Sequence, residues 1–322
     1  MCSRGSIKTV AGLFLLMSLL PGCGNNSNNI SISSNAISIN NASIEASVEA
    51  NIEASVSDNE VADEAGDNTA ISDSSSLNAI SDAVDIKNAK PGDIIVLGEY
   101  EQDGDQGKDP IEWIVLDEYE DTILVLSRYI IEKKAFNDTD TAVYWSQSTL
   151  GTWLNEDFIN EAFSDSEKEL IVTSTLNNPG SSQYFAEFGK SGGTATGNNT
   201  ADRVFLLSFD DVLKYYDPVK VEKYYVYASP ELICQATPAS GIENVSMDEL
   251  EYRMFYEEEG WPEECLNESG AGWFLRSHGI NGDDVMSVGY DGGVRGYYFQ
   301  IGADFEKVTF EGGVRPAMWI YK

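Results

Sequence analysis

Aromatic residues are confined almost entirely to one part of the chain. Apart from Phe14, every Phe, Tyr and Trp lies after residue 86. Aromatic side chains supply much of the area that a hydrophobic core buries, so only this C-terminal part can build one. Its length of about 235 residues suits a single sizeable core, and no second linker interrupts it. We therefore predict one globular domain over residues 86–322.

The segment before the domain, residues 23–85, has a different composition. From Gly24 to Asp85 there is no aromatic, lysine or arginine residue, and eleven carboxylates lie between Glu45 and Asp85. Its isoleucines are too sparse to bury a core against the entropy of ordering the chain. We expect a disordered acidic linker rich in Asn, Ser and Ala.

Residues 1–22 have the features of an export signal. Arg4 and Lys8 precede an apolar run over residues 10–20, which is too short to span a bilayer as a helix. The four residues ending at Cys23, Leu-Pro-Gly-Cys, resemble the lipobox of bacterial lipoproteins. That resemblance implies cleavage before Cys23 and attachment of acyl chains such as palmitate. The alternative is an ordinary signal peptide with a chance cysteine.

The lipobox therefore predicts an extracytoplasmic protein held at the cell membrane by a lipid anchor, since more than one acyl chain gives stable attachment.

The domain over residues 86–322 has 18 basic and 43 acidic residues, a net charge of −25. Such a surface repels nucleic acid and anionic headgroups. It suits cations, neutral glycans or basic proteins, and we expect no nucleic-acid partner.

Local patterns predict an α+β domain of short strands and a few helices. β-Branched and aromatic runs over residues 110–116 and 122–127 predict a hairpin, because acidic turn residues separate them. Apolar residues at offsets of three and four predict an amphipathic helix over residues 149–163. Ser164 and Ser208, each followed three residues later by a carboxylate, match the capping box that begins a helix.

The remaining segments give weaker patterns. The Gly-, Ser- and Asn-rich stretch 177–200 predicts a long loop, residues 203–207 a strand, and the acidic stretch 243–264 a surface helix or insertion. Four tryptophans in apolar runs are expected in the core: Trp113, Trp153, Trp273 and Trp319. Arg276 and Arg315 are expected to brace it.

Several blocks of sequence occur in an order that is typical of one family. The blocks are residues 100–103, 110–116, 124–127, 152–155, 204–208, 273–277 and 314–320. Together they resemble a bacterial domain of unknown function that is frequent in secreted and lipid-anchored proteins of Gram-positive bacteria. The last two blocks are similar to the C-type-lectin-like fold shared with formylglycine-generating enzymes. The resemblance implies a single C-type-lectin-like α+β domain with short antiparallel strands.

The inventory of reactive side chains argues against catalysis. His278 is the one histidine, and it stands where that family usually has a proline. Ser277 precedes it, but neighbours on a strand point to opposite faces, so we interpret His278 as a surface-turn residue and predict no catalytic residue. Formylglycine-generating enzymes need a close cysteine pair near the C-terminus, which Cys234 and Cys265 do not provide. A carboxylate-based glycan hydrolase remains an alternative.

One segment is a candidate binding face. Its candidate residues are Tyr290, Asp291, Arg295, Tyr297, Tyr298 and Gln300. The resemblance implies that this segment contributes to the ligand-facing surface, as it does in lectin-like folds. Tyrosine offers flat apolar area and a hydroxyl, which suit sugar faces or peptides. The alternative is that alternate residues of one strand pack inside the domain.

Two further candidates concern metal and redox chemistry. Asp103, Asp105 and Asp109 resemble the start of a calcium loop, although no glutamate stands at the twelfth position, and a solvated hairpin loop is the alternative. We expect no cofactor, with a calcium ion at this loop as the alternative. Cys234 and Cys265 could form a disulfide in an exported protein, or stay as two thiols.

These expectations favour a cell-surface lipoprotein whose domain binds an extracellular glycan, peptide or protein without catalysis. An extracytoplasmic glycan hydrolase and a structural envelope component are the alternatives.

Overall fold

The computed structural model describes residues 83–105, 107–222, 225–246, 256, 260–296 and 307–322. These residues belong to the compact unit Ser74–Lys322, the second of two in the chain. The predicted signal peptide, the predicted lipidation site Cys23 and nearly all of the predicted linker lie outside them. Within the described ranges, none of the helices combines the length and apolar character that crossing a membrane requires.

Strands make up most of the regular structure, as expected for an α+β domain. The strands are β1 (Ile94–Tyr100), β2 (Asp109–Tyr119), β3 (Thr122–Ser127), β4 (Glu132–Ala135), β5 (Ser174–Leu176), β6 (Thr200–Asp202), β7 (Val219–Val221), β8 (Val226–Ala228), β9 (Val245–Ser246), β10 (Ser269–Gly270), β11 (Trp273–His278), β12 (Val285–Val288), β13 (Gly293–Arg295), β14 (Glu311–Val314) and β15 (Ala317–Tyr321). The main helices are α2 (Thr149–Trp153), the π-helical η5 (Leu154–Phe158), α3 (Ile159–Ala162), α4 (Asp165–Lys168), α5 (Ser182–Glu187) and α6 (Phe209–Tyr216).

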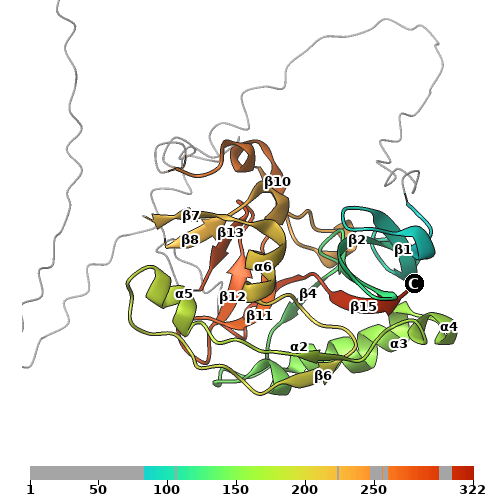
Figure 1. Cartoon of the computed structure of the whole chain (residues 1–322), viewed down its shortest axis with the longest axis horizontal. Coiled ribbons are helices and arrows are strands. Elements are labelled where there is room, and N and C mark those ends of the chain that lie inside the picture. Colours follow the sequence, from blue (N-terminus) through green and yellow to red (C-terminus); the bar gives the residue numbers. More distant parts are fainter. Residues whose placement is uncertain (1–82, 106, 223–224, 247–255, 257–259, 297–306) are drawn as a thin grey trace, which may run out of the picture. The chain divides into compact units, whose positions relative to one another are not determined.

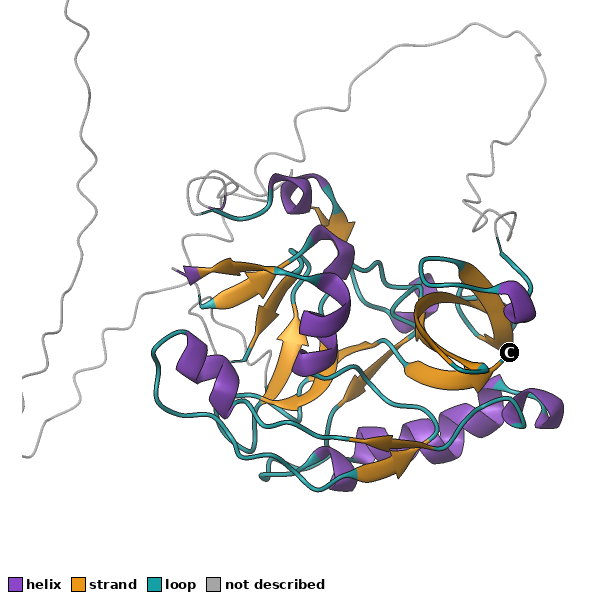
Figure 2. Ribbon diagram, in the orientation of Figure 1, coloured by secondary structure: helices purple, strands orange, loops and turns teal. Residues whose placement is uncertain are grey.

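Two sheets form the framework (Figures 1 and 2). One has four strands in the order β1-β2-β3-β15, and the other has seven in the order β4-β14-β11-β12-β13-β8-β7. Strands β11 and β14 pair in parallel, whereas their neighbours pair antiparallel. Helix α6 lies beside β11 and β12 in the view of Figure 1, and α2 to α4 run along one side.

The four-stranded sheet is completed by the C-terminus. β2 and β3 form the predicted hairpin, and β15 pairs with β3 from Ala317 opposite Leu126 to Tyr321 opposite Thr122. Trp113 of β2 is fully buried, and its indole N–H donates to Leu97 O at 2.8 Å. The last strand therefore covers an edge that the hairpin alone would leave open.

The predicted helix over residues 149–163 is confirmed as the continuous run α2, η5 and α3. Ser148 caps it by accepting a hydrogen bond from Gly151 N, and Leu150, Leu154 and Phe158 are buried along one face. Both predicted capping boxes are also present, at Ser164 before α4 and at Ser208 before α6.

Two predicted segments differ from the structure, and a third lies largely outside the described residues. Residues 203–207 form no strand, and Phe205 makes a single bridge to Ala317. The predicted loop 177–200 contains α5, because Tyr184 and Phe185 bury their rings in the core and hold a helical turn there. Of the stretch 243–264, the described parts include β9 and the start of the 3₁₀ helix η10 (Glu263–Asn267).

The C-terminal blocks form the core frame. Trp273 pairs in parallel with Gly313, where a Cβ would lie 2.4 Å from Gly272 O, so glycine is required. Trp273 is buried like Trp113, whereas Trp153 and Trp319 are half-buried against the core. The segment between the blocks, expected at the surface, instead contributes β12 and β13 to the sheet.

Candidate functional site

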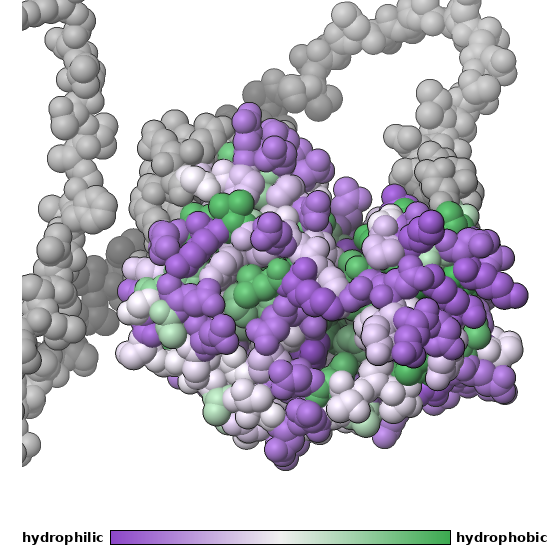
Figure 3. Space-filling model, in the orientation of Figure 1, coloured by the Kyte–Doolittle hydropathy of each residue, from purple (hydrophilic) through white to green (hydrophobic). Residues whose placement is uncertain are grey.

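A cavity of about 200 Å³ lies where the two sheets meet α6. It is lined by Leu124, Thr175, Leu176, Asn177, Pro179, Phe205, Ser208, Asp210, Asp211, Tyr215, Arg276 and Trp319. These residues come from β3 and β15 of one sheet, from β11 of the other, and from α6 and the segments before it. Figure 3 shows hydrophobic residues between hydrophilic ones near the centre of the face drawn.

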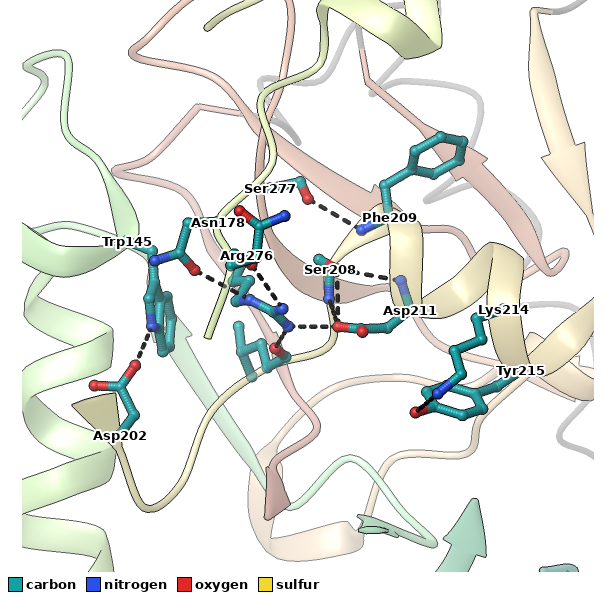
Figure 4. A network of polar contacts seen from close by, with 12 residues as sticks. Trp145, Asn178, Asp202, Ser208, Phe209, Asp211, Lys214, Tyr215, Arg276 and Ser277 are labelled. Atoms are coloured by element: carbon teal, nitrogen blue, oxygen red, sulfur yellow. Dashed lines mark hydrogen bonds and ion pairs between the residues drawn. The ribbon is translucent and has the colours of Figure 1, made fainter. Parts of the chain in front are cut away.

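The Arg276 guanidinium is held by acceptors on several segments (Figure 4). Its Nε–H donates to Asn178 Oδ1 at 3.2 Å, and Nη2 donates to Asn177 O at 3.1 Å. Nη1 donates to Leu206 O at 2.7 Å and to Asp211 Oδ2 at 2.6 Å. The side chain is only 5% exposed. The donors of Arg276 are thus engaged by the protein, and Asp211 balances its charge.

The first turn of α6 places Asp211 beside Arg276. Asp211 is the third helical residue, and its Oδ2 accepts hydrogen bonds of 2.8 Å from both Ser208 N and Ser208 Oγ. The N–H of Phe209 donates to Ser277 Oγ at 3.0 Å, which ties the helix start to β11. Three otherwise unpaired amide or hydroxyl groups at the helix start are therefore satisfied.

Asp210 is the negative group on the rim of the cavity. It reaches solvent, and it makes no hydrogen bond with the described part of the chain. Burial of part of the carboxylate, followed by the nearby Asp211 charge, raises the pKa of Asp210 above its ordinary value of 3.8. Arg276 opposes that shift without reversing it.

Aromatic side chains form the other wall of the cavity. Tyr215 is half-buried, and its hydroxyl donates to Asp117 Oδ2 at 3.1 Å. Burial raises the pKa of Tyr215 to about 12, so the phenol is neutral at physiological pH. The Lys214 ammonium lies over this ring at 4.5 Å from its centroid and pairs with Asp117 at 2.7 Å. With Trp319 half-buried nearby, the cavity combines acidic and aromatic walls.

Residues 120–322 match the family described as Domain of unknown function (DUF6273). This match covers more than half of the chain. The chain belongs to the DUF6273 family. All residues that line the cavity lie within the DUF6273 region, whereas β1 and β2 precede it. Neither the curated proteins nor the solved structures contain a match to the chain.

The predicted binding face differs from the expectation where the DUF6273 region is described. Asp291 is fully buried and accepts from Gly293 N at 3.1 Å and from Arg295 Nη1 at 2.8 Å. Arg295 also lies over the Trp261 ring at 5.7 Å. Asp291 and Arg295 therefore brace β13 against a small apolar cluster, and Tyr290 packs on the same cluster. Tyr297, Tyr298 and Gln300 lie outside the described residues.

The candidate calcium loop brings together only part of the predicted set. Carboxylate oxygens of Glu101, Asp103 and Asp109 lie within 4.8 Å of one another, and Asp105 is not among them. Asp109 Oδ2 accepts from Gln102 N at 3.1 Å and from Asp103 N at 3.2 Å. The acidic groups thus satisfy amides of the loop between β1 and β2.

His278 is not the surface-turn residue that we predicted. It is the last residue of β11 and is 4% exposed. The centroid of its ring lies 5.0 Å from that of Tyr144 and 6.2 Å from that of Phe136, both in T-shaped arrangements. Neither ring nitrogen has a hydrogen-bond partner among the described residues. The aromatic rings of Tyr144 and Phe136 pack against the imidazole, and its burial lowers the pKa of His278.

The predicted disulfide is not formed, and the alternative of two thiols holds. Cys234 packs in the main core and Cys265 in the separate cluster around Trp261, and both are buried and free. Burial raises the pKa of both thiols, which disfavours the reactive thiolate.

Sequence reasoning identified Arg276 as a brace, which its contacts confirm, but it missed the cavity. Asp210 and Tyr215 carried no motif of their own, and Trp319 was expected in the core. The one local signal was the capping box at Ser208, which positions Asp211.

Proposed function

We propose that this protein is a lipid-anchored receptor at the cell surface that recognises an extracellular glycan without catalysis. The leader ending at Cys23 supports the anchor, and the acidic segment 23–85 suits a flexible tether. The short antiparallel strands with few helices are consistent with the proposed C-type-lectin-like architecture. Two alternatives compete with this proposal: the ligand is a peptide or protein, or the protein has a purely structural role in the cell envelope.

The cavity beside Arg276 is the observation that carries this proposal. Ligand sites combine apolar and aromatic walls with a few well-placed polar groups, as here with Trp319, Tyr215 and the polar groups of Thr175 and Asn177. A volume of about 200 Å³ is below the roughly 300–1,000 Å³ of sites that enclose a whole ligand. The cavity therefore suits one ring of a longer chain that continues across the surface.

A glycan and cell-wall-fragment array probed with the full chain tests this proposal, with and without calcium. Trp319→Ala should weaken each specific hit by about tenfold or more, because an aromatic anchor is lost. Tyr321→Ala is the matched control, since Tyr321 lies two residues further along β15, is 44% exposed and does not line the cavity. Equal binding by both variants and the unaltered chain would refute the assignment of the site.

A glycan hydrolase is the second candidate, favoured by the raised pKa of Asp210 beside a second carboxylate. Such enzymes place two carboxyl groups on opposite sides of the scissile bond. Asp210 and Asp211 are instead neighbours in one helical turn, and Asp211 already binds Arg276 and Ser208. We therefore expect bound glycans to be released intact, as mass spectrometry after long incubation would show.

A further inference from the structure

The charged groups around the cavity leave one negative charge without a balancing cation. Asp211 pairs with Arg276, whose donors point to Asn178, Leu206 and Asn177 rather than into open space. Lys214, which lies on α6 and does not line the cavity, pairs with Asp117 at 2.7 Å. The carboxylate of Asp210 is the remaining charge on the cavity wall.

The rest of the cavity suits a cation with an apolar flank. Trp319 provides an aromatic side chain, whose negative π surface attracts cations, whereas Lys214 already lies over the Tyr215 ring at 4.5 Å. The net charge of −25 over residues 86–322 raises the local concentration of cations and repels anionic ligands. Because Arg276 is already neutralised, an anion would meet no free positive group here.

We propose that the ligand presents a protonated primary amine on a sugar ring, which pairs with Asp210 while the ring packs against Trp319 and Tyr215. This inference rests on the proposed glycan recognition and specifies its ligand as a glycan with free amino groups. The exposed polar groups of Thr175 and Asn177 offer partners for the ring hydroxyls. A lysine side chain shares the amine but would leave these groups without partners.

The electrostatics of the site predict how binding depends on pH. The groups facing Asp210 are Asp211 and Glu187, which raise its pKa, and Arg276, which lowers it, with burial as the largest cause of the raised value. An ammonium ion at this position relieves the repulsion and favours the ionised carboxylate. The affinity for the amino sugar should therefore be highest near neutral pH and should fall as acidification protonates Asp210.

Matched oligosaccharides test the proposal on the full chain. Glucosamine oligomers carry the amine, and N-acetylglucosamine oligomers of equal length lack it. We expect the glucosamine oligomers to bind at least about tenfold more tightly than the N-acetylated ones. This is the affinity difference that one charge-assisted hydrogen bond supplies. Asp210→Asn should abolish this preference. Asp165→Asn, which removes one charge from the first turn of α4 outside the cavity, should retain it.

The other outcomes are distinguishable. Equal binding of both oligomers, lost in Trp319→Ala, would overturn the amine and leave glycan recognition intact. Trilysine binding that depends on Asp210, without glucosamine binding, would overturn the sugar and identify a peptide ligand. If no oligomer binds and the array shows no hit that depends on Trp319, the proposed function itself fails.

Discussion

At the scale of single residues, Arg276 combines a buried charge with a nearly complete set of acceptors. Its partners come from the segment before α5, the segment before α6, and α6 itself. A guanidinium removed from water is tolerated when its donors are engaged and its charge is paired. The residue therefore holds three segments together at the wall of the cavity, and it is not available to a ligand.

Removing this guanidinium should be costly. Arg276→Met is expected to lower the free energy of unfolding by about 3 kcal/mol or more, because acceptors and the Asp211 carboxylate lose their partner. Arg128→Met is the control, since Arg128 pairs with Glu112 while 41% exposed and should matter by less than about 1 kcal/mol. Urea unfolding measures both, and equal losses would contradict the role of Arg276.

The buried imidazole of His278 predicts a pH dependence of stability. Burial lowers its pKa in the folded state, so the unfolded chain, with a pKa of about 6.5, binds the proton more readily. The free energy of unfolding should fall as pH decreases below about 6.5 and level off once the pH lies below the folded-state pKa.

His278→Phe should remove that component, since a phenyl ring fits beside Phe136 and Tyr144 and carries no proton. The measurement is the difference between the variant and the unaltered chain in urea unfolding across this pH range. The chain has one histidine, so its NMR titration reports the folded-state pKa directly. A folded-state pKa at or above 6.5 would disprove the explanation.

At the scale of elements, the two capping boxes have the same chemistry and different surroundings. Ser164 begins α4 at the surface, whereas Ser208 begins α6 at the cavity and orients Asp211 toward Arg276. The capping hydroxyl alone therefore stabilises a helix start in both places, but only one of them supports the proposed site.

Substituting the two serines separates these roles. Ser164→Ala and Ser208→Ala should each lower the free energy of unfolding by about 1 kcal/mol, the usual value of a helix cap. Ser208→Ala should also weaken binding at the cavity, because Asp211 loses a hydrogen bond that orients it. Binding measured on the glucosamine oligomers should be unchanged in Ser164→Ala, and a parallel loss in both would contradict the local effect.

At the scale of the whole molecule, the two sheets contribute residues to the cavity, and the negative charge of the domain attracts cationic ligands and repels anionic ones. Association with a glucosamine oligomer should slow strongly as salt rises from about 0.01 M to about 1 M, because the screening length shortens from about 30 Å to 3 Å. Dissociation should change less. The N-acetylated oligomer serves as the neutral control in stopped-flow measurements.

Much of the fold was predictable from local sequence. The hairpin of β2 and β3, the helix over residues 149–163 and the starts of α4 and α6 each follow from patterns spanning fewer than twenty residues. The errors came where long-range packing decided the outcome. Asp291 lies in a polar, glycine-rich stretch, yet it is buried and pairs with Arg295. His278 is buried against Phe136 and Tyr144, which are far from it in the chain.

By itself, the sequence determined the position of the folding domain, its α+β class and its strongly acidic charge, because these depend on composition and short periodicities. Only the tertiary structure decided where a ligand could bind. The cavity joins Leu124 of β3 to Trp319 of β15 and to Asp210 and Arg276, which are far apart in the chain. Their meeting depends on strand order and register, and no local pattern encodes either of these.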